Sequence, residues 1–171
     1  MPHRSRNILA LLLAAALSHA PAVAGERLSG AATAVDGRHL RLNGKLIALA
    51  GIAAPALDAK CLWRGKTVRA CGRMARAAMR DLTVAAKVTC FPDRDRGGWR
   101  CQADGYDLAE GLIHAGWAIP APGAPARWLD EKRRAKARRL MLWRARTLAG
   151  EDFLPALARK IRREKTPLDK N

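Results

Sequence analysis

The chain has 171 residues, and its 32 lysines and arginines against 15 aspartates and glutamates give a formal net charge of +17. This length allows one domain with a core of ordinary size and argues against a two-domain enzyme. Because 49% of the residues are hydrophobic, the chain is not a wholly disordered basic protein, and we expect a single folded, strongly basic domain.

The N-terminus has the layout of a secretory signal. Arg4 and Arg6 precede an apolar run over residues 8–17, and small residues follow up to Ala24. The run is about half of the roughly 20 residues that span a bilayer, so a membrane anchor is the less favoured alternative. We expect cleavage after Ala24, no transmembrane span in the mature chain, and a secreted or periplasmic protein.

The four cysteines agree with export, because thiols pair in an oxidising compartment. Three connectivities are possible, and pairing neighbours as Cys61–Cys71 and Cys90–Cys101 closes two short loops, each worth roughly 3 kcal/mol. We favour this pattern. A zinc site is the alternative, but the chain has no Cys-x-x-Cys spacing and only His39 and His114 beyond the signal.

The first part of the mature chain reads as strands followed by a helix. Asp36-Gly37 and Asn43-Gly44 favour tight hairpin turns, so we expect a meander of three strands within residues 28–52. Residues 53–66 contain Pro55 and Gly65 and read as a loop. Apolar residues at helical spacing then predict a helix over residues 68–82.

The second part contains a hairpin and further helices. Short strands over residues 87–91 and 99–102 flank a polar hairpin tip, residues 92–98. Asp107 followed by Glu110 has capping-box spacing and predicts a helix that ends at Gly116. A long basic helix over residues 127–146 is expected next, and then a loosely held basic tail over residues 150–171.

Five strands with a helix after the third is the order of a small Greek-key barrel of the oligonucleotide/oligosaccharide-binding type. We therefore expect an α+β fold that is mainly β, a five-stranded OB-fold Greek-key barrel with about three helices. The expected domain covers residues 25–149, between the signal at 1–24 and the tail at 150–171.

Several stretches, in order and in register, resemble the thermonuclease family of secreted calcium-dependent nucleases, which are built on this barrel. The matching stretches are Val35-Asp36-Gly37, Leu49 to Pro55, Cys71 to Ala75, Asp93 to Gly98, Gly105 to Leu108, Gly116 to Ala118, and Ala135 with Leu142-Trp143. The resemblance covers residues 28–143. It implies a staphylococcal-nuclease-like fold and, for the family, calcium-dependent hydrolysis of DNA and RNA phosphodiesters.

The chain departs from the family pattern at the residues that perform hydrolysis. After Asp36, Arg38 stands where the family has a metal-ligating Asp, and Ala53 stands at the second ligand position. Ala48 replaces a phosphate-binding Arg, and Ala56 replaces the Glu that orients or deprotonates the attacking water. Losing one charge-stabilising donor commonly lowers a rate by ~10²- to 10³-fold. We therefore expect calcium binding to be lost and hydrolysis to be lost or very weak.

Some chemistry of the family stays open as an alternative. Arg96 and Arg100, at and beside the hairpin tip, are candidates for the family's second arginine. An active nuclease is conceivable if carboxylates gather around a different metal, and the candidates are Asp36, Asp58, Asp93 and Asp95. His39 is a weak general base as long as no carboxylate pairs with it.

The remaining positive charge predicts sequence-independent binding of DNA, RNA or another polyanion by a monomer. The expected contacts are Arg38, His39, Arg96, Trp99, Arg100, Lys132, Arg133, Lys136 and Arg139. Among them, Trp99 would stack on an unpaired base. The simplest alternative is a solvated basic face, and the functional alternative is an envelope protein that binds anionic lipid, cell-wall polymer or an acidic partner.

Overall fold

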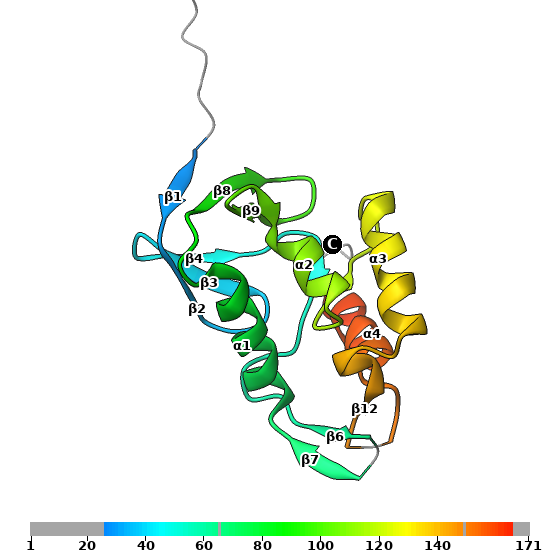
Figure 1. Ribbon diagram of the computed structural model, residues 1–171. Helices are drawn as coiled ribbons and strands as arrows, with labels where there is room; N and C mark the ends of the chain where they lie inside the picture. Colours follow the sequence, from blue (N-terminus) through cyan, green and yellow to red (C-terminus); the bar gives the residue numbers. More distant parts are fainter. Residues whose placement is uncertain (1–25, 65, 149, 166–171) are drawn as a thin grey trace, which may run out of the picture.

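The computed structural model describes residues 26–64, 66–148 and 150–165, with side chains up to residue 159. In this part of the chain, strands and four α-helices form a mixed α+β fold, and the strands are divided among four small sheets (Figure 1). The predicted α+β class is confirmed. The predicted signal at 1–24 lies outside the described residues.

The expected meander is present. The strands β2 (Ala32–Ala34), β3 (His39–Leu42) and β4 (Lys45–Ala48) pair antiparallel in this order. At the second turn, Asn43 and Gly44 have φ values of 50° and 78°, the left-handed backbone that this dipeptide tolerates best. The side chains of this sheet that are fully buried are Leu40, Leu42 and Ile47.

A second sheet contains the predicted hairpin. Its order is β1 (Leu28–Gly30), β8 (Val88–Asp93), β9 (Gly98–Ala103) and β10 (Tyr106–Asp107), and all its pairings are antiparallel. Residues 28–34 supply β1 to this sheet and β2 to the meander.

A second link joins the two sheets beyond β4. Leu49 forms an isolated parallel bridge with Trp99 of β9, and the Ala50 N–H donates to the Trp99 carbonyl at 2.9 Å. The meander is thus connected to the second sheet at both of its outer strands.

The cysteines pair in the favoured way. Cys61 is bonded to Cys71 and Cys90 to Cys101, so the described residues contain no free thiol for the alternative zinc site. The second bridge joins residues that face each other directly across β8 and β9.

The predicted loop over residues 53–66 is wrong in part. It contains β6 (Cys61–Trp63), which pairs with β7 (Thr67–Arg69) and with the distant β12 (Ala145–Arg146). Because β7 occupies the residues before the helix, α1 spans Cys71–Thr83 and starts later than predicted. Before β6 in the chain, β5 (Ile52–Ala53) pairs with β11 (Ile119–Pro120).

The helix α2 (Leu108–His114) begins as predicted. Asp107 is its N-cap, and the Asp107 side chain accepts a hydrogen bond from the Glu110 N–H at 3.1 Å. Gly116 follows its end with φ of 80°, and the Trp117 N–H donates to the Leu112 carbonyl at 2.8 Å. This is a Schellman ending, in which the left-handed position favours glycine.

The substitution Gly116→Ala is expected to lower the free energy of unfolding by about 2 kcal/mol, through left-handed strain and a close contact. A Cβ at this position would lie 2.8 Å from the Leu140 carbonyl oxygen. Gly123 has the same φ of 80° and no atom within 4 Å of its Cβ position, so Gly123→Ala should cost only about 1 kcal/mol. Equal losses in urea unfolding would contradict the contact.

The predicted long helix over residues 127–146 is wrong. α3 spans Ala126–Ala137, and the chain then turns through Arg139, whose φ is 50°, into the short 3₁₀ helix η1 (Met141–Arg144). The turn places the Leu142 side chain in a buried cluster that is separate from the main core. A helix that continued to residue 146 would prevent this placement.

The expected basic tail begins with a packed helix. α4 spans Phe153–Lys165 and lies beside η1 and β12 (Figure 1). Phe153 and Leu154 are buried in the same cluster as Leu142. No helix among the described residues is long and apolar enough to cross a bilayer.

Candidate functional site

The first hairpin uses the Asp36 carboxylate for local contacts. Asp36 Oδ1 accepts the N–H groups of Arg38 and His39, each at 2.7 Å. His39 Nδ1 lies 2.8 Å from Asp36 Oδ2. The structure therefore gives His39 the paired carboxylate that the sequence prediction did not foresee, and leaves its Nε2 directed away from that contact.

Burial on its own would raise the pKa of Asp36, but hydrogen bonds outweigh it. The His39 side chain and the backbone N–H groups of Arg38 and His39 stabilise the charged carboxylate, so the pKa of Asp36 is lower than its ordinary value. Asp36 is therefore ionised at neutral pH.

The substitution Asp36→Asn is expected to lower the free energy of unfolding by about 1 kcal/mol at pH 7, because the charge-assisted contact to His39 is lost. The folded-state pKa lies below the unfolded-state value, so the carboxylate stabilises the fold above about pH 4, and this contribution is lost at lower pH. The gap between the variant and the wild type should shrink from about pH 5 to about pH 2 in urea unfolding. Asp81→Asn, at an exposed surface pair, is the control, and an equal pH dependence there would contradict the assignment.

The same hairpin lies against the segment that follows β4. Arg38 Nε donates to the Leu49 carbonyl at 3.1 Å. A Cβ at Gly37 would lie 2.8 Å from the Ala75 Cβ and 3.0 Å from the Ala54 Cβ, so only glycine allows this approach to α1 and to the chain after β5. The first hairpin and the segment from Leu49 to Ala54 both contain positions of the predicted site, and these two segments are therefore in contact.

Alanines occupy three positions of the predicted site. Ala48 is half-buried at the end of β4, and Ala53 is buried where β5 pairs with Ile119. Ala56 is exposed, and its carbonyl lies against Gly72 in the first turn of α1. Methyl groups at these positions supply neither a metal ligand nor a proton acceptor.

The residues present do not fit calcium. Calcium takes several oxygen ligands, but the only carboxylate of the first hairpin, Asp36, already contacts the backbone N–H groups of Arg38 and His39 and the His39 ring. In the described part of the chain, no three His, Cys, Asp or Glu side chains form a metal-ligating group. The alternative nuclease required that four carboxylates gather around a metal. The structure does not bring these carboxylates together as a metal-ligating group: Asp36, Asp58, Asp93 and Asp95.

The hairpin tip, residues 92–98, positions Arg96. Asp93 accepts the Arg96 N–H at 3.1 Å and the Arg96 Nη1 at 2.7 Å. A Cβ at Gly51 would lie 2.9 Å from the Arg96 Cδ and 3.1 Å from the Trp128 ring, so Arg96 and the first turn of α3 both pack on Gly51. The Nε of Arg96 is buried and has no partner among the described residues.

Trp99 and Arg100 form cation–π contacts, whereas Arg96 forms an ion pair with Asp93. The guanidinium groups of Arg27 and Arg100 lie 5.4 Å and 5.8 Å from the centre of the Phe91 ring. Lys45 Nζ lies 4.6 Å from the centre of the Trp99 ring, so one face of the predicted stacking platform carries an ammonium group. A cavity of about 950 Å³ beside the tip is lined by Arg27, Phe91, Trp99 and Arg100 together with others, which include Arg96 and three acids: Glu26, Asp93 and Asp95.

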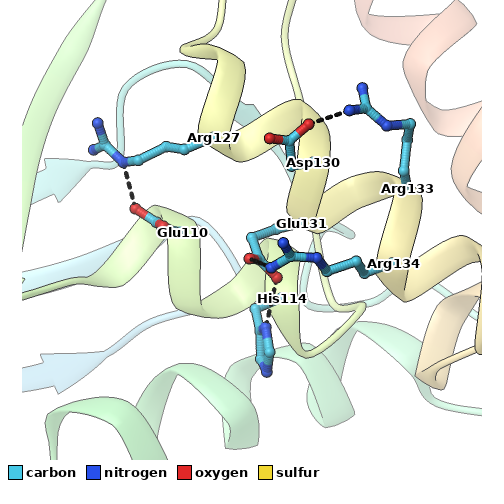
Figure 2. A network of polar contacts seen from close by, with 7 residues as sticks. All are labelled: Glu110, His114, Arg127, Asp130, Glu131, Arg133 and Arg134. Carbon is cyan, nitrogen blue, oxygen red and sulfur yellow. Dashed lines mark hydrogen bonds and ion pairs between the residues drawn. The ribbon is translucent and has the colours of Figure 1, made fainter.

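Ion pairs join α2 and α3 (Figure 2). Arg127 Nε donates to Glu110 Oε2 at 2.6 Å, and Glu131 accepts from His114 and Arg134, each at 2.7 Å. The hydrogen bond from His114, with the nearby Arg134 charge, holds the pKa of Glu131 below its ordinary value. This face is largely charge-balanced.

The predicted binding set on the long helix is therefore divided. Arg133 pairs with Asp130 on the same helix (Figure 2). Lys132 and Lys136 form no ion pair with the described side chains, and they are the free cations of the set on α3. Arg139 lies beyond the end of α3 and lines a separate pocket.

The sequence analysis did not identify Trp128 as a residue near the site. Trp128 is 4% exposed, whereas its neighbour Leu129 is 40% exposed. The missed signal is helical spacing, since Trp128 and the buried Ala135 are seven residues apart and lie on one face.

No protein-family model matches the chain. It is 32% identical over 149 residues to the succinoglycan biosynthesis protein ExoI of Rhizobium meliloti (strain 1021), and the alignment covers 82% of this chain and 77% of the relative. The chain therefore belongs to the same family as the succinoglycan biosynthesis protein ExoI.

Proposed function

We propose that this is an exported polyanion-binding protein with a thermonuclease-like barrel, which binds nucleic acid and has lost phosphodiester hydrolysis. Two disulfides are compatible with an oxidising compartment outside the cytoplasm.

The strand pairings support the barrel in this proposal. Residues 28–34 pair with β8 through β1 and with β3 through β2, and β3 pairs with β4. Beyond β4, Leu49 bridges to β9, and β9 pairs with β8. Followed in this order, the pairings lead back to the starting segment, and this order supports our proposal of a five-stranded barrel of the oligonucleotide/oligosaccharide-binding type.

One observation carries the binding proposal. Arg38 donates to the Leu49 carbonyl, and Arg96 packs on Gly51, so two arginines contact the same short segment after β4. Guanidinium groups match phosphate oxygens in geometry and charge. The adjoining positions Ala48 and Ala53 add no carboxylate that would repel a phosphate.

The same arrangement argues against hydrolysis. Transition-state charge on a phosphodiester needs a cation or several donors, and the attacking water needs a base. The arginines here would hold the ground-state phosphate, but alanine occupies the position that the resemblance assigns to the base, Ala56. Binding that is equal in the ground state and the transition state does not accelerate a reaction.

A cleavage assay tests this proposal. The purified protein should bind a labelled oligonucleotide at low salt and leave DNA and RNA uncut, with or without calcium. Turnover at a rate usual for a nuclease would overturn the loss of hydrolysis. Cleavage that is independent of calcium and abolished by His39→Gln would assign the reaction to the Asp36–His39 pair instead.

The relative favours a second candidate function. Its name connects it with the biosynthesis of a glycan, succinoglycan. An exported basic protein of the same family would then bind an acidic polymer or partner of the cell envelope through the arginines proposed to bind nucleic acid, Arg38 and Arg96. Competition between a labelled oligonucleotide and polygalacturonate separates the two candidates. Displacement of the oligonucleotide at low polygalacturonate concentrations, at equal ionic strength, would favour the glycan.

A further inference from the structure

A second concentration of positive charge lies away from the hairpin tip. A pocket of about 540 Å³, called here the arginine pocket, is lined by five arginines and one acid: Arg64, Arg138, Arg139, Arg144, Arg146 and Asp152. It forms where β12 pairs with β6, and these strands lie at the opposite end of the molecule from β8 and β9 (Figure 1).

Backbone carbonyls hold two of these arginines in place. Arg144 Nε donates to the Arg139 carbonyl at 2.6 Å, and Arg146 Nε donates to the Gly150 carbonyl at 2.5 Å. Each bond uses the inner nitrogen, so the two terminal nitrogens of each guanidinium remain to bind a ligand. The Trp143 side chain also lines the pocket, and its buried Nε1 has no acceptor among the described residues.

The positive charge of the pocket is poorly balanced. None of the five arginines forms an ion pair with another described side chain, and Asp152 is the single acid of the lining. By contrast, the cavity beside the hairpin tip has four arginines against three acids. Low-dielectric walls around charges of one sign focus the field and favour an anionic ligand.

Two of the arginines have a backbone conformation that arginine rarely adopts. Arg64 and Arg139 have φ values of 51° and 50°. Arg139 ends α3 in a Schellman motif, with its N–H bonded to the Lys136 carbonyl and the Leu140 N–H bonded to the Ala135 carbonyl. At the same position of α2 the chain has Gly116. Such strained backbone concentrates at functional sites.

We propose that the arginine pocket binds a ligand with two adjacent phosphates, either a free diphosphate compound or two neighbouring phosphates of a nucleic-acid strand. Five guanidinium groups supply enough paired donors for two phosphates, because each binds a phosphate through two parallel hydrogen bonds. The volume is that of a small-molecule site. This site is separate from the one in the proposed function and does not depend on it.

Titration calorimetry with inorganic pyrophosphate at low salt tests the proposal. The purified protein should bind it saturably, and Arg139→Gly and Arg146→Gln should each weaken binding at least ~10-fold, because each removes charge-assisted hydrogen bonds. Arg76→Gln, which removes an exposed arginine on α1, should leave the affinity unchanged. Since glycine is favoured at the end of α3, Arg139→Gly should weaken binding without lowering the Tm, which separates lost contacts from lost folding.

Competition identifies the source of the phosphates. If pyrophosphate displaces a labelled oligonucleotide, and if Arg139→Gly weakens both, the pocket binds strand phosphates. If pyrophosphate binds with no effect on the oligonucleotide, the ligand is a free diphosphate. The proposal is overturned if pyrophosphate does not bind, or if it binds the two pocket variants as tightly as Arg76→Gln. Either result leaves the nucleic-acid site beside Arg38 and Arg96 untouched.

Discussion

The affinity for a short DNA duplex is expected to fall roughly 150-fold when the salt concentration rises from about 50 to about 200 mM. This fall follows from the cations of the predicted binding set that form no ion pair with a described side chain and lie outside the arginine pocket: Arg38, Arg100, Lys132 and Lys136. Each phosphate contact contributes about −0.9 to the slope of log affinity against log salt, so contacts from these side chains give a slope of about −3.6.

The other cations of the predicted binding set are not counted, because each is already paired or lies elsewhere. Arg96 is paired with Asp93, Arg133 with Asp130, and His39 with Asp36. Arg139 lines the arginine pocket, which shares no residue with the cavity beside the hairpin tip. These contacts reduce the number of cations that are free to displace counterions from DNA.

Fluorescence anisotropy across a salt series measures the slope. Arg100→Gln removes an exposed, unpaired charge and should make the slope less negative by about 0.9. Arg41→Gln removes an equal charge at an exposed position on β3, and we expect it to leave the slope unchanged. A slope near zero for the wild type, or an equal change in both variants, would contradict the assignment.

Local signals in the sequence predicted the elements that depend on few neighbours. The Asn43-Gly44 turn and the Asp107 cap are set by backbone preference and by a hydrogen bond three residues away, so the sequence alone predicted both correctly. The disulfide pairing followed from short loops in the same way. In each case the determining interaction lies within about a dozen residues.

The errors have two causes, distant pairing and an unusual residue at a helix end. The strand β6 was missed because β6 and its neighbour β7 are too short to show a periodicity, and its other partner β12 lies more than 80 residues later. The same pairing brings Arg64 into one pocket with Arg144 and Arg146, so the sequence alone gave no sign of the arginine pocket. The end of α3 was missed because an arginine occupies the left-handed position where glycine is the usual signal.

The Asp36–His39 contact shows a different limit. The two residues are only three positions apart, and a tight hairpin at Asp36-Gly37 was predicted. Sequence alone does not specify that the carboxylate turns back onto the imidazole, because this depends on the side-chain conformations that the folded hairpin selects.

The substitution Gly72→Ala is expected to lower the free energy of unfolding by about 3 kcal/mol or more, the upper end of overpacking costs. Gly72 lies in the first turn of α1, where a Cβ would be 1.8 Å from the Ala56 carbonyl oxygen and 2.6 Å from the Leu57 backbone. Backbone atoms cannot move aside as a flexible side chain can, and the Cys61–Cys71 disulfide ties the adjoining residue. The helix and the loop that carries Ala56 must therefore separate.

Gly111→Ala is the matched control for this prediction, because both glycines are buried in helices without left-handed φ and both gain helix propensity as alanine. At Gly111 the new methyl group would meet only side chains, the nearest being the half-exposed Tyr106 ring at 2.8 Å, which can turn into solvent. Urea unfolding with the disulfides intact should show a near-neutral effect for Gly111→Ala and a large loss for Gly72→Ala. Equal stability of the two variants would contradict the close packing of α1 against the segment at Ala56. The helix would then not fix Ala56, the position at which the resemblance expects the catalytic base.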